Sequence, residues 1–232
     1  MVVLIVGGTG GIGSALISIF QKQGYHVHAT YHIQPATTDA GISWYPCDAT
    51  DDHSVERLAA SVGHIDLLIN CIGILYTDLQ LPEKSIQQFN VDFFQKNIQT
   101  NTLPTLLLAK HFQSRLKAPH PTYFICLSAK VGSIEDNHLG GWISYRASKA
   151  ALNMCIKTIA IEWKTKLPKC CVIAFHPGTI DTPLSVPFQK RISKQQLNSP
   201  DWLAEKLNQL IDELGPGETG RFYNYASEIL PW

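Results

Sequence analysis

Short apolar runs alternate with longer amphipathic segments along almost the whole chain, and this alternation limits the fold more than any other feature. Most of the runs carry no polar alternation, which is typical of strands covered on both faces. Strands that alternate with helices predict a parallel sheet with right-handed crossovers. We therefore expect residues 1–232 to form a single α/β domain of Rossmann type, a doubly wound parallel sheet of about seven strands with helices on both faces.

The expected elements follow from these runs and from helix-capping residues. Ser199 and Pro200 suit the first positions of the last helix, and Gly215 ends it. The least regular stretches, 130–143 and 178–198, follow strand ends, where open α/β sheets bind ligands. The strands are expected at 2–6, 26–31, 42–47, 67–71, 123–127, 171–175 and 222–225, and the helices at 12–23, 54–62, 89–116, 145–164 and 201–214.

Composition narrows the class of protein. With 45% hydrophobic and 16% charged residues, the 232-residue chain resembles an ordinary globular protein. Because 19 basic residues balance 19 acidic ones, we expect neither nucleic acid nor a membrane as a partner. The six cysteines form no C-x-x-C pair, so neither a disulfide framework nor a metal site is expected. The N-terminal apolar run is too short for a signal peptide, which predicts a cytoplasmic location.

A glycine-rich turn follows the first expected strand and precedes the first expected helix. It reads Gly7-Gly8-Thr9-Gly10-Gly11-Ile12-Gly13. Such a turn lets backbone approach a pyrophosphate and directs the free N–H groups of a helix N-terminus at its charge. Gly7, Gly11 and Gly13 fit the spacing G-x-x-x-G-x-G, whereas Gly7, Gly10 and Gly13 fit G-x-x-G-x-x-G. The glycines alone leave both registers open.

A tyrosine and a lysine, Tyr145 and Lys149, open a later helical segment. Their spacing of four residues places both side chains on one helix face. A free tyrosine has a pKa of about 10, and a neighbouring ammonium is expected to lower that pKa. The pair can then act as a general acid or base toward a substrate oxygen.

With these elements in place, the chain resembles the short-chain dehydrogenase/reductase family over essentially its whole length. Within that family it most resembles C-factor-like and sniffer-like carbonyl reductases. The strings that carry the resemblance are Gly7–Gly13, Asp48 in Cys47-Asp48-Ala49, Asn70-Cys71-Ile72-Gly73, Asn97-Ile98-Gln99-Thr100-Asn101, Val131-Gly132-Ser133-Ile134, Tyr145 to Met154, His176-Pro177-Gly178-Thr179 and Pro231-Trp232.

The resemblance implies roles for individual residues. Tyr145 would exchange a proton with a carbonyl or alcohol, Lys149 would hold the nicotinamide ribose, and Asn101 would support a proton-relay water. Hydride transfer itself belongs to the cofactor. The implied cofactor-binding residues are Gly7, Thr9, Gly10, Gly11, Ile12, Gly13, Tyr31, His32, Asp48, Asn70, Cys71, Gly73, Tyr145, Lys149, Pro177, Gly178 and Thr182.

One departure concerns the serine that members of this family use to bind the substrate oxygen. The expected serine pair reads Ser128-Ala129 here, and strand alternation points Ser128 away from the position of the second serine. Ser128 could serve through a local bend, Ser133 could reach in from the following loop, or the hydroxyl could be missing. We favour Ser128 over Ser133. A second departure, Cys71-Ile72 where the family often has Asn-Ala, is expected to affect packing rather than chemistry.

The choice of cofactor depends on the end of the second strand. An acid there would bind the adenosine ribose of NAD, whereas a basic residue would accept the 2′-phosphate of NADP. The segment ends in Tyr31-His32 and contains no acid, which favours NADP(H), with NAD(H) as the alternative.

Three functions are compatible with these motifs. The first is an NAD(P)(H)-dependent oxidoreductase that reduces a carbonyl or oxidises an alcohol of small or medium size. The second is a catalytically weak dinucleotide-binding protein with a signalling or sensing role, which the Ser128-Ala129 departure keeps open. The third, a nucleotide-sugar epimerase or dehydratase, fits less well, because enzymes of that kind have longer chains with a separate C-terminal substrate domain. By family analogy we expect a homo-oligomer, a dimer or tetramer.

Overall fold

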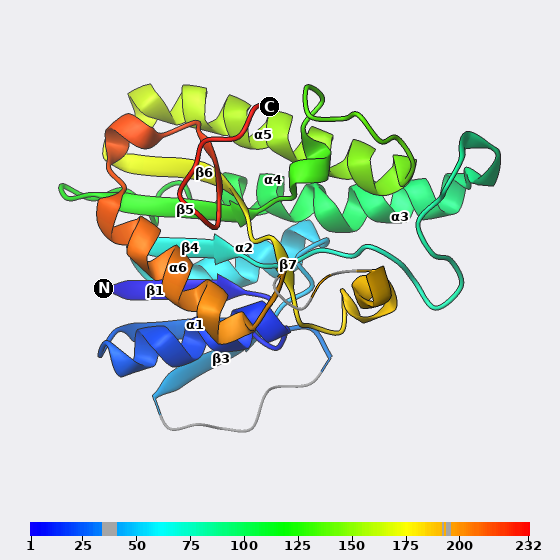
Figure 1. Ribbon diagram of the computed structural model, residues 1–232. Coiled ribbons are helices and arrows are strands. Elements are labelled where there is room, and N and C mark those ends of the chain that lie inside the picture. Colours follow the sequence, from blue (N-terminus) through cyan, green and yellow to red (C-terminus); the bar gives the residue numbers. More distant parts are fainter. Residues whose placement is uncertain (34–40, 192, 194–195) are drawn as a thin grey trace.

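A computed structural model describes residues 1–33, 41–191, 193 and 196–232. Seven parallel strands form one sheet in the order β3-β2-β1-β4-β5-β6-β9 (Figure 1). This order reverses direction between β1 and β4, as in a doubly wound Rossmann sheet, so the expected fold class is confirmed. The strands are β1 (Val2–Val6), β2 (His26–Tyr31), β3 (Ile42–Pro46), β4 (Leu67–Asn70), β5 (Thr122–Leu127), β6 (Cys170–His176) and β9 (Phe222–Asn224).

Helices cover both faces of the sheet (Figure 1). On one face, α1 (Gly11–Lys22) packs beside α6 (Pro200–Glu213) over a core that includes Phe20 and Phe175. On the other face lie α2 (Asp52–Ser61), α4 (Leu103–Phe112) and α5 (Ile143–Lys166). Strand β5 contributes to both cores, Phe124 to one and Ile125 to the other, which explains why its apolar run has no polar alternation.

The single long helix expected at residues 89–116 is wrong. The segment forms two helices, α3 (Val91–Asn101) and α4, and α3 starts later than expected, after Asn90 caps the amide of Phe93. Pro104 explains the break, because proline has no N–H to donate to the preceding turn and its ring crowds that turn. Thr102 lies at the break, with φ −112°, and its hydroxyl donates to the carbonyl of Ser148 in α5.

The stretch expected to be irregular after β6 contains some structure of its own. Strand β7 (Thr179–Ile180) pairs in parallel with β8 (Leu197–Asn198), and a short 3₁₀ helix, η3 (Val186–Arg191), lies between them. Two-residue strands are too short to produce a periodic sequence signal. Within the described residues, no helix has the length and apolar character needed to cross a membrane.

Candidate active site

The glycine turn joins β1 to α1 at the carboxyl edge of the sheet and is fixed to β2. Gly7 has φ +85°, a left-handed conformation that favours glycine. The amide of Gly7 donates to the Thr30 hydroxyl at 2.9 Å, and the amide of Gly8 donates to the Thr30 carbonyl at 2.9 Å. Gly10 is the N-cap of α1, so the free N–H groups of the first helical turn lie next to the turn.

The structure distinguishes the two glycine registers that the sequence left open. A Cβ at Gly13 would lie 2.3 Å from the carbonyl oxygen of Gly7, and a Cβ at Gly11 would lie 2.7 Å from Cγ2 of Thr182. A Cβ at Gly10 would come no nearer than 3.4 Å to its closest neighbour, which is close to ordinary contact. The positions that require glycine are therefore Gly7, Gly11 and Gly13, the G-x-x-x-G-x-G register.

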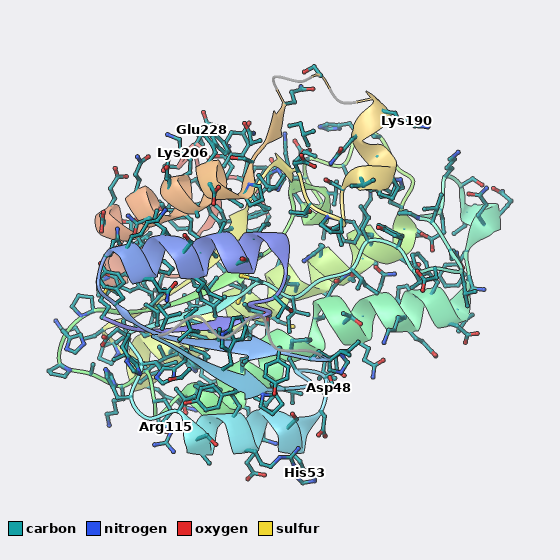
Figure 2. All side chains as sticks on the ribbon, turned by 90° about the horizontal axis from the view of Figure 1, so that it is seen from below. Asp48, His53, Arg115, Lys190, Lys206 and Glu228 are labelled. Atoms are coloured by element: carbon teal, nitrogen blue, oxygen red, sulfur yellow. The ribbon has the colours of Figure 1, made fainter. Side chains whose placement is uncertain are left out.

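A cavity of about 320 Å³ opens beside the glycine turn, and we call it the glycine-turn cavity. Four of the expected cofactor residues, Gly7, Thr9, His32 and Asp48, line it. The other lining residues, which were not among the expected cofactor residues, are Thr30, Cys47, Ala49, Thr50, Ile72, Ile74, Lys96 and Thr100. Figure 2 shows Asp48 at this end of the sheet, near the start of α2.

Asp48 and His32 face each other, with 3.7 Å between the Asp48 carboxylate and Nε2 of His32. Burial alone would raise the pKa of Asp48, but hydrogen bonds from Thr50 and the charges of His32 and Lys96 hold that pKa below its ordinary value. A carboxylate therefore stands beside the residue expected to meet the adenosine 2′ position. The sequence did not indicate this pairing, because the two residues are 16 positions apart.

Tyr145 lies in a second cavity of about 210 Å³, which we call the tyrosine cavity. The ring is buried and packs in a small apolar cluster with Leu75, Ala129 and Trp142. Nζ of Lys149 lies 5.9 Å from the centre of the Tyr145 ring and donates to the carbonyl of Leu127, at the end of β5, at 3.0 Å. The tyrosine and the lysine thus lie on one helix face, as the spacing indicated.

The expected direction of the tyrosine pKa is wrong for this structure. Burial in the apolar cluster raises the pKa of Tyr145 instead of lowering it. Burial also lowers the pKa of Lys149 to about 8, because the ammonium loses its hydration. The four-residue spacing indicates the charge of the lysine next to the tyrosine but carries no information on the desolvation of the two groups.

Asn101 connects the two sides of the site. Its carbonyl oxygen accepts from the amide of Ile74 at 2.7 Å, and its side-chain nitrogen donates to the Ile74 carbonyl at 3.0 Å and to the Ser148 hydroxyl at 2.9 Å. The Ser148 hydroxyl in turn donates to the carbonyl of Tyr145 at 2.8 Å. Asn101 therefore joins the loop after β4 to the helix that carries the tyrosine.

The two serine candidates occupy different places. Ser128 lines the tyrosine cavity together with Ala129, and its buried hydroxyl donates to the side-chain oxygen of Asn153 at 2.5 Å. Ser133 lines a separate cavity, where its hydroxyl donates to the carbonyl of Trp232 at 3.1 Å. Ser128 thus lines the same cavity as Tyr145, with its hydroxyl directed at Asn153, whereas Ser133 lies in another cavity.

The remaining candidates lie along the same edge of the sheet. Ile12, Pro177, Gly178 and Thr182 line the tyrosine cavity. Asn70 is buried, donates to Thr105 and accepts from the amide of Ile72. A Cβ on Gly73 would lie 3.4 Å from Nζ of Lys149, so the chain passes close to the lysine there. Cys71 follows β4, and burial raises the pKa of its thiol. The ring of Tyr31, at the end of β2, lies 6.5 Å from the ring of Trp44.

Sequence reasoning missed the residues that hold the start of α5. Glu83 is buried, and its carboxylate accepts from the amide and the hydroxyl of Ser144. The carbonyl of Glu83 accepts from the amide of Trp142, which has a left-handed conformation with φ 53°. A Leu-Pro-Glu string in a loop gave no signal for this role, because the partner lies 61 residues away.

Trp142 forms one wall of the tyrosine cavity. Its ring centre lies 6.4 Å from that of Tyr145 and 5.2 Å from that of Phe188 in η3. Tyr76 packs against Phe188, with 6.0 Å between the two ring centres. The cavity that holds the tyrosine hydroxyl is therefore walled largely by aromatic and aliphatic side chains.

Two features lie on the same edge of the sheet: a glycine turn that leads into a helix N-terminus, and a helix with a buried tyrosine and lysine. Together they define a nicotinamide-dependent oxidoreductase of Rossmann type. The sequence profile of the short chain dehydrogenase family matches residues 1–193. The chain belongs to this family.

Individual relatives agree with this membership. The chain is 29% identical over 238 residues to a 1-hydroxy-2-glutathionyl-2-methyl-3-butene dehydrogenase of Rhodococcus sp. (strain AD45), with 99% of both chains covered. Its fold matches the carbonyl reductase Sniffer of D. melanogaster at TM-score 0.86 and 22% identity, covering 100% of this chain and 99% of that one. It also matches the NADPH-bound carbonyl reductase from chicken fatty liver at TM-score 0.86 and 23% identity, covering 100% and 98%.

Proposed function

We propose that this oxidoreductase reduces apolar, preferably aromatic, carbonyl compounds, or oxidises the corresponding alcohols, with Tyr145 as general acid and base. The observation that carries the proposal is the placement of the Tyr145 ring in a cavity walled by Trp142, Phe188 and aliphatic side chains. Largely apolar walls, with the Tyr145 phenol among a small number of polar groups, favour a substrate with a polar oxygen on an apolar body.

In this proposal, Tyr145 delivers the proton. Its raised pKa keeps the phenol protonated at neutral pH, ready to donate to the oxygen of a carbonyl. Lys149 has a pKa of about 8, and its Nζ lies 5.9 Å from the Tyr145 ring centre, so it can exchange protons near neutral pH on the same side of the helix. Asn101 positions the tyrosine helix through Ser148. A bound nicotinamide would supply or accept the hydride.

The cofactor would lie along the carboxyl edge of the sheet, held by the residues named above. Gly11 and Gly13 let the start of α1 pack closely against Thr182 and the Gly7 carbonyl. The free N–H groups of the helix N-terminus then lie beside the turn, where a pyrophosphate would bind. The glycine-turn cavity would take the adenosine, and Pro177 and Gly178 would border the nicotinamide.

We favour NADP(H) over NAD(H), because His32 and not an acid follows β2 and because the chicken carbonyl reductase of the same fold is described with NADPH. Asp48, 3.7 Å from His32, is the feature that opposes this choice, since a carboxylate repels a 2′-phosphate. Kinetics with both cofactors decide it. Higher kcat/KM with NADH than with NADPH would overturn the preference, and His32→Ala should weaken NADPH binding more than NADH binding.

Ser128 is our candidate for the hydroxyl that binds the substrate oxygen, because it lines the tyrosine cavity beside Ala129. Its bond to Asn153 would have to turn for this role. A catalytically weak dinucleotide-binding protein is the second candidate function, favoured by Ala129 at the usual serine position. The homo-oligomeric state and the cytoplasmic location stay predictions.

A panel of aldehydes, ketones and quinones, followed by NADPH consumption, tests the proposal. Tyr145→Phe should reduce turnover by about 10²- to 10⁴-fold while NADPH binding stays intact. Tyr123→Phe is the matched control, because the Tyr123 hydroxyl donates to the backbone carbonyl of Leu214 and not to a group of the site. Tight NADPH binding without turnover on any carbonyl would favour the sensor, and full activity of Tyr145→Phe would refute the role of the phenol.

A further inference from the structure

Two histidines far apart in the sequence converge on one carboxylate at the amino edge of the sheet. Nε2 of His64 lies 2.9 Å and Nε2 of His120 lies 2.8 Å from the same oxygen, Oδ1 of Asp66. The two imidazole rings meet edge to face, with 5.8 Å between their centres. One ligand atom from each of the three residues lies within 4.8 Å of the other two.

Asp66 is held rigidly in this position. Its second carboxylate oxygen accepts from the amide of Val2 at 2.7 Å, and its own amide donates to the carbonyl of Val2 at 2.8 Å. The carbonyl of Asp66 accepts from the amide of Tyr123 in β5. These bonds leave the Asp66 side chain only 14% exposed and point Oδ1 outward, toward the two rings.

The two histidines are also restrained. His120 stands between Pro119 and Pro121, and a residue flanked by prolines has few accessible backbone conformations. His64 precedes Ile65, which is fully buried and whose amide donates to the carbonyl of Arg115. Both side chains are about half exposed, so solvent and ions reach the cluster.

The cluster is separate from the active site. Asp66 immediately precedes β4, whereas Asn70 and the catalytic loops follow the carboxyl end of that strand. Figure 2 shows Arg115, whose carbonyl binds Ile65, at the end of the sheet opposite to Asp48.

We propose that His64, Asp66 and His120 form a Zn²⁺ site that ties the loop after α4 to the first residues of β1 and β4. Zn²⁺ binds imidazole nitrogen and carboxylate oxygen at about 2.0–2.2 Å, which separates neighbouring ligand atoms by about 3.3–3.6 Å. The histidine-to-carboxylate distances here, 2.9 Å and 2.8 Å, need to open by about 0.4–0.8 Å to reach that separation. Water would complete the four-coordinate shell, because the histidines are exposed.

The amide of Val2 would support metal binding indirectly, since its bond to Oδ2 of Asp66 fixes the orientation of the ligating carboxylate. Spacing in the sequence could not indicate this site, because 54 residues separate His120 from Asp66. The expectation that the chain has no metal site rested on such spacing alone.

Isothermal titration of the full chain with ZnCl₂ tests the proposal. One equivalent should bind with a Kd in the micromolar range or tighter, and Zn²⁺ should raise the thermal unfolding midpoint. His64→Ala and His120→Ala should each weaken binding by about tenfold or more and abolish the thermal shift. Asp66→Asn should also weaken binding, and it retains an acceptor for the Val2 amide.

His53→Ala is the control, because His53 is an exposed histidine paired with Glu56 on α2 and should leave Zn²⁺ binding unchanged. Titration with Co²⁺ separates this site from the cysteines, since ligation by nitrogen and oxygen gives no thiolate-to-cobalt charge-transfer band. Absence of binding, or equal binding by His64→Ala, His120→Ala and wild type, would overturn the proposal. NADPH-dependent turnover should not change with Zn²⁺, so the outcome does not depend on the proposed function.

Discussion

Alanine substitutions at Gly10 and Gly11 measure how closely α1 packs against the segment after β6. At Gly11 the new methyl group would lie 2.7 Å from Cγ2 of Thr182, so one of the two must move. Overpacking of this kind costs about 1–3 kcal/mol, and the lower entropy of the unfolded alanine chain offsets about 0.4–1 kcal/mol. We expect Gly11→Ala to reduce the free energy of unfolding by about 1–2 kcal/mol.

Gly10→Ala is the matched comparison. Its methyl group would meet only the Gly7 carbonyl, at 3.4 Å, and the backbone at φ −72° suits any residue. Loss of the glycine N-cap preference destabilises the variant, whereas the lower entropy of the unfolded alanine chain stabilises it. The two effects nearly cancel, leaving a change within about 0.5 kcal/mol. Urea unfolding of the apo protein gives both values without any contribution from cofactor binding.

Thr182→Ser removes the methyl group that Gly11→Ala would strike. In the double variant, the cost of Gly11→Ala should therefore fall to about 0.5 kcal/mol or less, measured against Thr182→Ser alone. Equal losses for Gly10→Ala and Gly11→Ala, or no relief in the double variant, would refute both the packing argument and the G-x-x-x-G-x-G register.

Three further predictions test other parts of the site. Glu83→Ala should cost about 2–4 kcal/mol in urea unfolding, because the buried amide and hydroxyl of Ser144 lose their acceptor, whereas Glu83→Gln should cost about half as much. Burial lowers the pKa of His176 to about 4, so as pH falls from 6.5 toward 4 this histidine takes up a proton in the unfolded chain but not in the folded protein. The free energy of unfolding should fall by up to about 3 kcal/mol over that range, and His176→Gln should reduce this loss; an unchanged pH profile would contradict the prediction. Trp142→Ala should raise KM for aromatic carbonyls with a smaller change in kcat, lowering kcat/KM by about 10- to 100-fold; an equal loss for small aliphatic aldehydes would argue against a wall that contacts the substrate.

The sheet and the glycine turn could be read from the sequence because their signals are local. Most strands of the main sheet are short runs of mainly apolar residues, and the turn between β1 and α1 carries its glycines in seven consecutive residues. The break between α3 and α4 could also have been read, since Pro104 interrupts the predicted helix. The hydrophobic pattern continues on both sides of Pro104, and this continuity favours a single helix when the proline is given less weight.

Other parts of the site depend on contacts between distant segments. Glu83 reaches Ser144 across 61 residues, and Asp48 meets His32 only because β2 and β3 lie side by side. The direction of the Tyr145 pKa depends on burial, which no spacing of tyrosine and lysine encodes. Ser128 and Ser133 differ in sequence by five positions, yet only the fold shows which of them lines the tyrosine cavity.

The hydroxyl of Ser148 couples the proton-transfer helix to the opposite side of the site, because it donates to Tyr145 and accepts from Asn101. Phe188, which forms part of the cavity wall, is not a member of that hydrogen-bonded chain. Its ring packs against the rings of Trp142 and Tyr76. New substrate preferences can therefore evolve, or be engineered, by replacing residues of η3 while the acid–base apparatus keeps its alignment. Replacements along α3 or α5 would alter reactivity and selectivity together.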